Sequence, residues 1–141
     1  MSQTELTYFH GTLIASKQLN GGILFVGHPQ IGKTSLSLYM INMCGFSLIA
    51  DDLVAIKHSP AGPIGYLYNQ HYKGLLYVRN YGLLKVGSFY SSTFVRFIVY
   101  LFNHETQNNY SNFLNCSFFS LCVRNKTWCQ CYSILRKIIF T

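Results

Sequence analysis

Apolar residues occur in short runs along the first 87 positions, and most of these runs have the composition of β-strands. They are rich in branched and aromatic side chains and are separated by polar or glycine-containing turns. A stretch at residues 35–41 instead predicts a helix, which Gly45 would end. Gly21 and Gly22 close a polar turn and predict an antiparallel hairpin. Many strands around one helix predict an α/β fold. The predicted strands cover residues 6–15, 23–26, 46–50, 53–56, 64–68 and 75–78.

The segment between the second strand and the helix fits the phosphate-binding pattern G-x-x-x-x-G-K-[ST]. Its glycines let backbone N–H groups point at phosphate oxygens. Lys33 supplies a charge for the β- and γ-phosphates, and Thr34 offers a hydroxyl to Mg²⁺. A strand before the loop and a helix after it are the setting that this motif requires. A glycine-rich turn without a ligand is the alternative. The predicted nucleotide-binding residues are Gly27, His28, Pro29, Gln30, Ile31, Gly32, Lys33 and Thr34.

Two adjacent carboxylates, Asp51 and Asp52, lie between two apolar runs and are two of only four acidic residues in the chain. Acids in such a place are costly unless they are solvated, bound to a cation or used in chemistry. An apolar strand that ends in Asp after a phosphate loop suits a metal ligand or a general base. The alternative is a turn between two separate strands, because Asp favours turns.

Bulk composition narrows the function classes. The length of 141 residues fits one domain with a real core. The net charge of +7 comes from dispersed basic residues, so binding to nucleic acid or to an anionic membrane is a weak alternative. The five cysteines lack zinc-site spacing. No signal peptide is recognised, and the apolar run 94–102 is short and contains Arg96. A cytoplasmic protein that crosses no membrane is expected.

Four segments recur in the order and spacing of one known family. They are His10-Gly11-Thr12, the phosphate loop, residues 48–54 around the two acids, and residues 74–83. The chain resembles the catalytic domain of HPr kinase/phosphorylase, in the short form found in alphaproteobacteria. The resemblance implies a mixed sheet carrying a phosphate loop, related to phosphoenolpyruvate carboxykinase. It also implies an ATP- and Mg²⁺-dependent serine kinase of the phosphocarrier HPr that regulates carbohydrate metabolism through the phosphotransferase system. The family further implies removal of the phosphate by phosphorolysis, and a homo-oligomer, a hexamer.

The resemblance also implies roles for single residues. Lys33 and Thr34 would handle the phosphates and Mg²⁺, with Asp51 as a second candidate metal ligand. Asp52 matches the acid that takes the proton from the substrate serine. His10 matches the active-site histidine of the family, although an isolated histidine in a strand usually has no such role.

Some residues depart from the family pattern. Tyr77 stands where the family has a glutamate that helps to hold Mg²⁺, and tyrosine does not replace a carboxylate. Asn80 replaces a glycine, and Ser35 stands where long family members often have Glu. A degenerate nucleotide-binding relative with little kinase activity is therefore the alternative function.

Composition changes abruptly after Gly87. All eleven glycines lie at or before this position, and the remaining residues are rich in Phe, Tyr, Ser, Asn and Cys. We expect a kinase-like domain at residues 1–87 and a divergent tail at 88–141, with the family fold truncated or divergent after about residue 87. One hypothesis is a frameshift in the gene; the alternative is a genuine aromatic tail. Residues 94–102 fit a strand, a helix or a surface contact equally well.

Overall fold

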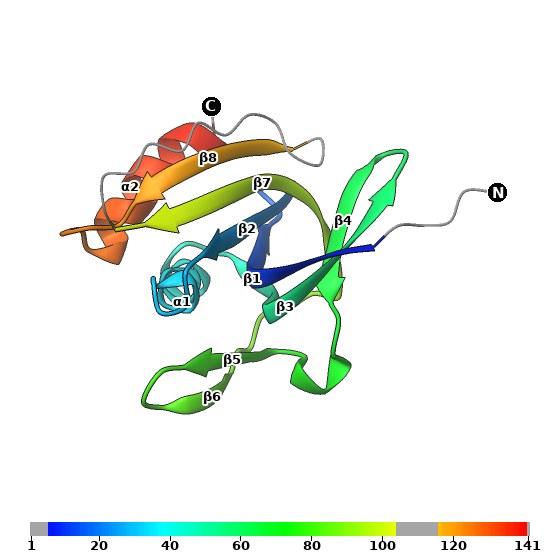
Figure 1. Ribbon diagram of the computed structural model, residues 1–141, viewed down its shortest axis with the longest axis horizontal. Coiled ribbons are helices and arrows are strands. Elements are labelled where there is room, and N and C mark those ends of the chain that lie inside the picture. The colour runs from blue at the N-terminus through cyan, green and yellow to red at the C-terminus, as the bar shows by residue number, and fades with distance from the viewer. Residues whose placement is uncertain (1–5, 104–115, 141) are drawn as a thin grey trace.

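A computed structural model describes residues 6–103 and 116–140 of the chain. Figure 1 shows a curved sheet with helices beside it and a small separate hairpin below. A single turn of 3-10 helix, Gln70–Tyr72, precedes that hairpin. In chain order the elements are β1 (Leu6–Ser16), β2 (Gly21–Gly27), α1 (Lys33–Met43), β3 (Ser47–Ser59), β4 (Gly62–Leu67), β5 (Leu75–Val78), β6 (Gly82–Lys85), β7 (Ser92–Phe102), β8 (Ser117–Cys122) and α2 (Trp128–Ile139).

The main sheet is mixed, as expected for an α/β fold with a phosphate loop. β1 pairs antiparallel with β2 and with β3, so the predicted hairpin is confirmed. β4 pairs antiparallel with β3 and β7. β7 also runs parallel to β2 and to β8. The pairings β2–β1–β3–β4–β7–β2 therefore form a closed circuit, to which β8 is added.

Two apolar cores lie on opposite faces of these strands, because successive side chains of a strand point to opposite sides. Leu13 and Leu24 belong to one core, with residues from the five strands of the circuit and Cys116. Their neighbours Ile14 and Phe25 belong to the other core, which contains the buried faces of α1 and α2 and is called the helix-side core below. Burial on both faces explains why β2 is apolar along its whole length rather than alternating.

Helix α1 follows the phosphate loop and ends as the sequence predicts. Leu36 and Met40, four residues apart, are fully buried and pack into the helix-side core. Gly45 takes a φ of 76°, a conformation that glycine adopts at little cost after a helix. None of the helices among the described residues is long and apolar enough to cross a membrane.

Three features differ from the expectations or settle an open alternative. The runs flanking Asp51 and Asp52 form one continuous strand, β3, so the prediction of two separate strands was wrong. Residues 94–102 lie within strand β7. A C-terminal helix, α2, follows β8; it begins with a capping box in which Thr127 and Gln130 each bond the backbone N–H of the other.

Residues after 87 are structurally continuous with those before it. Strand β7 is hydrogen-bonded between β2 and β8, and Val95, Ile98, Val99 and Leu101 are buried in the two cores. The predicted division into a kinase-like domain at residues 1–87 and a divergent tail at 88–141 remains a prediction.

Candidate functional site

The phosphate loop joins the end of β2 to the start of α1. Gly27 has a φ of 150° and Gly32, the N-cap of α1, a φ of 117°. A Cβ at Gly27 would lie 2.7 Å from the carbonyl oxygen of Leu101 in β7, so the close approach of these strands also requires glycine. The first turn of α1 contains no acidic side chain, and Gly32 provides no side-chain cap. The free N–H groups and the helix dipole at this point favour an anion.

Lys33 folds back over the loop. Its Nζ donates hydrogen bonds to the carbonyl oxygens of Gly27 at 2.8 Å and His28 at 3.0 Å. Burial lowers the pKa of Lys33, and the charges of Asp51 and Asp52 partly oppose this effect. The ammonium group is therefore held at the loop, where a bound phosphate would meet it.

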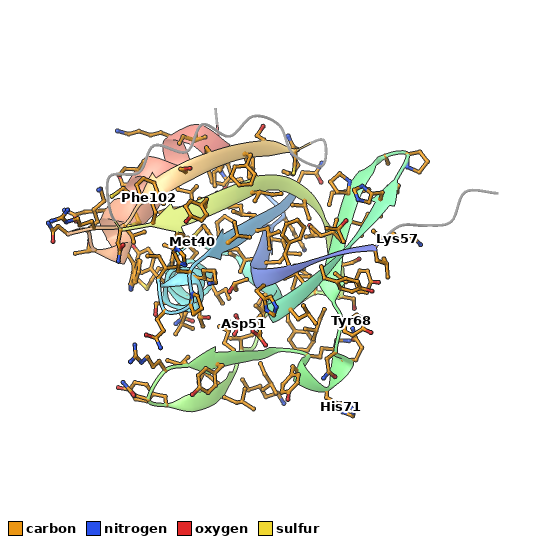
Figure 2. All side chains as sticks on the ribbon, viewed as in Figure 1. Met40, Asp51, Lys57, Tyr68, His71 and Phe102 are labelled. Carbon is orange, nitrogen blue, oxygen red and sulfur yellow. The ribbon has the colours of Figure 1, made fainter. Side chains whose placement is uncertain are left out.

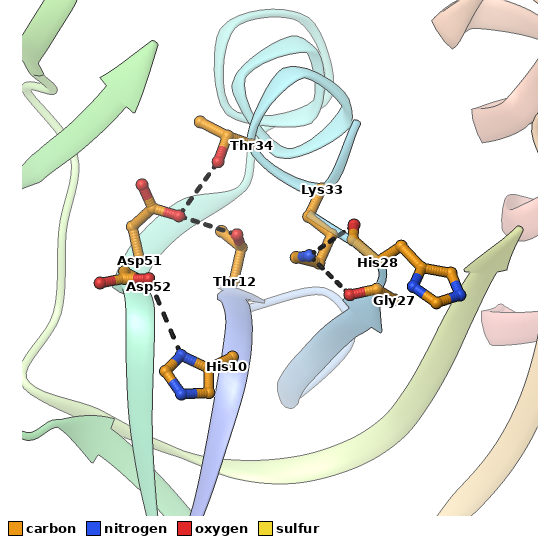
Figure 3. Close-up of polar contacts among 8 residues, drawn as sticks. All are labelled: His10, Thr12, Gly27, His28, Lys33, Thr34, Asp51 and Asp52. Atoms are coloured by element: carbon orange, nitrogen blue, oxygen red, sulfur yellow. Dashed lines mark hydrogen bonds and ion pairs between the residues drawn. The ribbon is translucent and has the colours of Figure 1, made fainter. Parts of the chain in front are cut away.

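Asp51 is fixed by three donors. Oδ1 accepts hydrogen bonds from Thr12 Oγ1 at 2.8 Å and Thr34 Oγ1 at 3.1 Å, while Oδ2 accepts one from the Tyr77 backbone N–H at 3.0 Å. Burial raises the pKa of Asp51, and these bonds work against that rise. Register explains the first bond, because Thr12 and Asp51 are directly opposite each other on β1 and β3. Figure 3 shows the carboxylate between the two hydroxyls.

Asp52 has a different environment from its neighbour. Its φ of 75° is rare for a residue other than glycine, and such conformations concentrate at functional sites. The carboxylate turns toward His10, and Asp52 Oδ1 lies 3.9 Å from His10 Nδ1 (Figure 3). The side chains of His10 and Asp52 are 84% and 88% exposed. An exposed pair at this distance adds little stability. Because both side chains are exposed, both groups are accessible to a reactant.

The β5–β6 hairpin covers the loop and the acids from the other side. Figure 2 shows Asp51 facing the space between this hairpin and the main sheet. The space is a cleft of about 770 Å³, lined by groups from both sides. Arg79 Nη1 donates to Gln30 Oε1 at 3.0 Å, which joins the hairpin to the phosphate loop. Asn80 has a φ of 72°, a left-handed conformation that asparagine adopts more readily than most residues.

Most of the predicted site residues meet in this cleft. His10, Lys33, Thr34, Asp51 and Asp52 all line it, with the loop residues Gly27, Pro29 and Gln30. The other loop residues do not line it: His28 contributes its carbonyl to Lys33, Ile31 packs against the helix-side core, and Gly32 caps α1. The chemical roles assigned to these residues remain predictions.

Thr12 and Arg79 complete the arrangement but were not among the predicted site residues. Thr12 is 1% exposed and its hydroxyl is directed at Asp51. Arg79 bonds the loop through Gln30. Both residues lie in segments that carry the family resemblance, and this position is the sequence signal by which they could have been predicted.

A second hollow of about 630 Å³ lies elsewhere, between the β3–β4 turn and the start of β7. Arg96 is the one charged side chain among the described residues that line it. These described lining residues include no carboxylate, so the cleft over the phosphate loop is the candidate site.

Known proteins of one family resemble the chain. The profile of the HPr Serine kinase C-terminal domain matches residues 2–116. The HPr kinase/phosphorylases of Bordetella pertussis and Bordetella bronchiseptica are each 34% identical to the chain over 90 residues, or 64% of it. The matched region spans only 28% of the length of these relatives.

A solved structure shows the same fold. The HPr(Ser) kinase/phosphatase from Coxiella burnetii superposes with a TM-score of 0.76 at 18% identity, covering 93% of this chain and 95% of that one. Both this superposition and the family profile extend beyond residue 87. The fold of the family thus continues into the segment whose composition is atypical.

Proposed function

The chain belongs to the HPr serine kinase C-terminal domain family, and on this premise we propose that it transfers the γ-phosphoryl group of ATP to a serine of an HPr-like phosphocarrier. The observation that carries the proposal is the difference in environment between two adjacent acids. Asp51 is held by Thr12 and Thr34 beside the phosphate loop, and Asp52 is exposed beside His10.

The loop residues suit a nucleotide with its metal. Backbone N–H groups at the start of α1 and the Lys33 ammonium would hold the phosphates. Thr34 Oγ1 and Asp51 lie 3.1 Å apart and offer the hard oxygen atoms that Mg²⁺ prefers. Mg²⁺ usually takes one or two carboxylates and completes its shell with water and phosphate, so this small donor set fits the ion. When bound, the ion would neutralise charge on the phosphates.

Asp52 would act as the base, with His10 beside it. The serine oxygen forms a bond to the γ-phosphorus as the bond to the β-phosphate oxygen breaks, and the serine proton passes to the Asp52 carboxylate. His10 Nδ1, 3.9 Å from Asp52 Oδ1, would help to orient this carboxylate. In phosphorolysis, inorganic phosphate would attack the phosphoserine, and protonated Asp52 would return its proton to the serine oxygen.

One observation favours a second candidate, a nucleotide-binding relative with little transfer activity. Tyr77 replaces the expected glutamate, and its side chain is 60% exposed. Its backbone N–H still bonds Asp51, so the hairpin keeps its position while the additional carboxylate is missing. Nucleotide binding would persist in such a protein while transfer falls.

The test is transfer of phosphate from radiolabelled ATP to purified HPr, combined with equilibrium dialysis of ATP in the presence of Mg²⁺. We expect Lys33→Ala to abolish nucleotide binding and transfer. Asp52→Asn should leave binding intact and lower transfer by two orders of magnitude or more, as is typical for loss of a general base (about 10²–10⁴-fold). Nucleotide binding by the wild type without transfer selects the second candidate. Unchanged binding by Lys33→Ala contradicts the loop assignment.

A further inference from the structure

The two glycines of the phosphate loop are backed by residues from the last third of the chain. Behind Gly27 lies the carbonyl of Leu101 in β7. Behind Gly32 lies the indole ring of Trp128, the first residue of α2. A Cβ at Gly32 would overlap Cη2 of this ring and would lie 3.0 Å from Cζ2 and 3.2 Å from Cζ3. The ring therefore occupies the space that any other residue at position 32 would need.

Trp128 is held in this place from several directions. The capping box of Thr127 and Gln130 fixes the backbone immediately around it. The half-buried ring also packs against the helix-side core, as does Ile31 of the loop. One turn further along α2, Tyr132 packs against Tyr39 of α1, with ring centroids 6.4 Å apart. Helix α2 thus packs against α1, and the Trp128 ring at its start lies against Gly32 of the loop.

Trp128 lies outside the cleft. It is not among the residues that line the cleft, and it contacts the loop from behind. Gly32 sits at the junction of loop and helix with a φ of 117°. A bulky ring behind such a residue restricts the conformations of the loop. Affinity for a ligand falls in proportion when a smaller share of the protein holds the competent conformation.

We propose that Trp128 is a positioning residue that holds the phosphate loop in its nucleotide-competent conformation, so that the packing of its ring behind Gly32 and the binding of nucleotide phosphates favour each other. The proposal rests on the nucleotide binding proposed above. It assigns a function to the C-terminal helix, which carries no residue of the cleft.

The test compares Trp128→Ala with Tyr132→Ala, a matched control that removes packing between the same helices away from the loop. The affinity of each full-length protein for ATP with Mg²⁺ is measured by equilibrium dialysis, and thermal melting reports the loss of stability. We expect Trp128→Ala to weaken ATP binding by about two- to thirtyfold. Tyr132→Ala should lower the melting temperature without this loss, and Trp128→Phe, which keeps a ring behind Gly32, should restore most of the affinity.

Trp128 is also the only tryptophan of the chain, so its emission reports on the loop directly. We expect wild-type emission to change on addition of ATP and Mg²⁺, with the dissociation constant found by dialysis. This measurement decides the matter if Trp128→Ala does not fold. ATP binding without a change in emission, or equal affinities of Trp128→Ala and Tyr132→Ala, overturns the role of Trp128 and leaves the proposed function intact. Absence of ATP binding by the wild type overturns both.

Discussion

Replacing Thr12 by valine removes one hydroxyl from the candidate site with almost no change in shape. Thr12 is 1% exposed, and its Oγ1 donates a 2.8 Å hydrogen bond to Asp51 Oδ1. A hydrogen bond to a charged group contributes about 1.5–3 kcal/mol to stability. Asp51 keeps its bonds from Thr34 and the Tyr77 backbone, so we expect Thr12→Val to lower the free energy of unfolding by about 1.5–3 kcal/mol at neutral pH.

The loss of stability caused by Thr12→Val should depend on pH in a defined direction. Burial already raises the pKa of Asp51 above that of the unfolded chain, so this group contributes stability at low pH that is lost as pH rises through the folded-state pKa. The Thr12 bond favours the charged carboxylate, and its removal raises the pKa of Asp51 further. The difference between wild type and Thr12→Val should therefore be largest at neutral pH and shrink as Asp51 becomes protonated.

Chemical denaturation at neutral pH and at a series of lower pH values, followed by Trp128 emission, measures this difference. Thr12→Ser is the control, because it keeps the hydroxyl and loses only a buried methyl group. Its cost, about 1 kcal/mol, should not vary with pH. A cost of Thr12→Val that is equally independent of pH would refute the reasoning, because Thr12 would then contribute only packing.

Three further predictions follow from contacts around the cleft. Tyr77→Glu should lower the Mg²⁺ concentration needed for half-maximal transfer to HPr, because it adds a carboxylate next to Asp51; Tyr77→Gln is the control, and an equal effect of both would contradict the metal role. Gly11→Ala should cost at least about 1–3 kcal/mol in denaturant unfolding, because its Cβ would overlap the Phe25 carbonyl, whereas Gly87→Ala, in open space, should be neutral. Arg79→Ala, which loses the bond to Gln30, should weaken ATP binding measured by dialysis, and an unchanged affinity would show that the hairpin does not support the loop.

Local patterns were sufficient to predict the phosphate loop, the helix after it and the first hairpin. The different environments of Asp51 and Asp52 were not predictable in the same way. They depend on the register that places Thr12 opposite Asp51 and on the left-handed backbone at Asp52. The strand nevertheless continues through both acids where the sequence suggests a turn, because its pairing with β1 is unbroken at these positions.

The C-terminal part shows a different limit of sequence reasoning. Strand β7 was ambiguous because its apolar run is buried on both faces and has no periodicity that separates strand from helix. Helix α2 does carry a local signal, the Thr127-x-x-Gln130 capping box, although the composition after Gly87 is unusual for a folded domain. The frameshift hypothesis concerns the gene, and resequencing of the locus tests it: if no other frame encodes a family-like C-terminus, the hypothesis fails.

The parallel pairing of β2 with β7 has a consequence for how the protein is made. Gly22 pairs with Val95, so more than seventy further residues must be synthesised before strand β2, which leads into the phosphate loop, can pair with its second neighbour. Until then the outer edge of β2, which is apolar on both faces, is an unpaired edge of the kind that templates aggregation. Pairing over such a separation is also slow, because a long loop must close first. During synthesis, the stretch between the appearance of Gly27 and that of Phe102 is therefore the period in which the nascent chain most needs protection by chaperones.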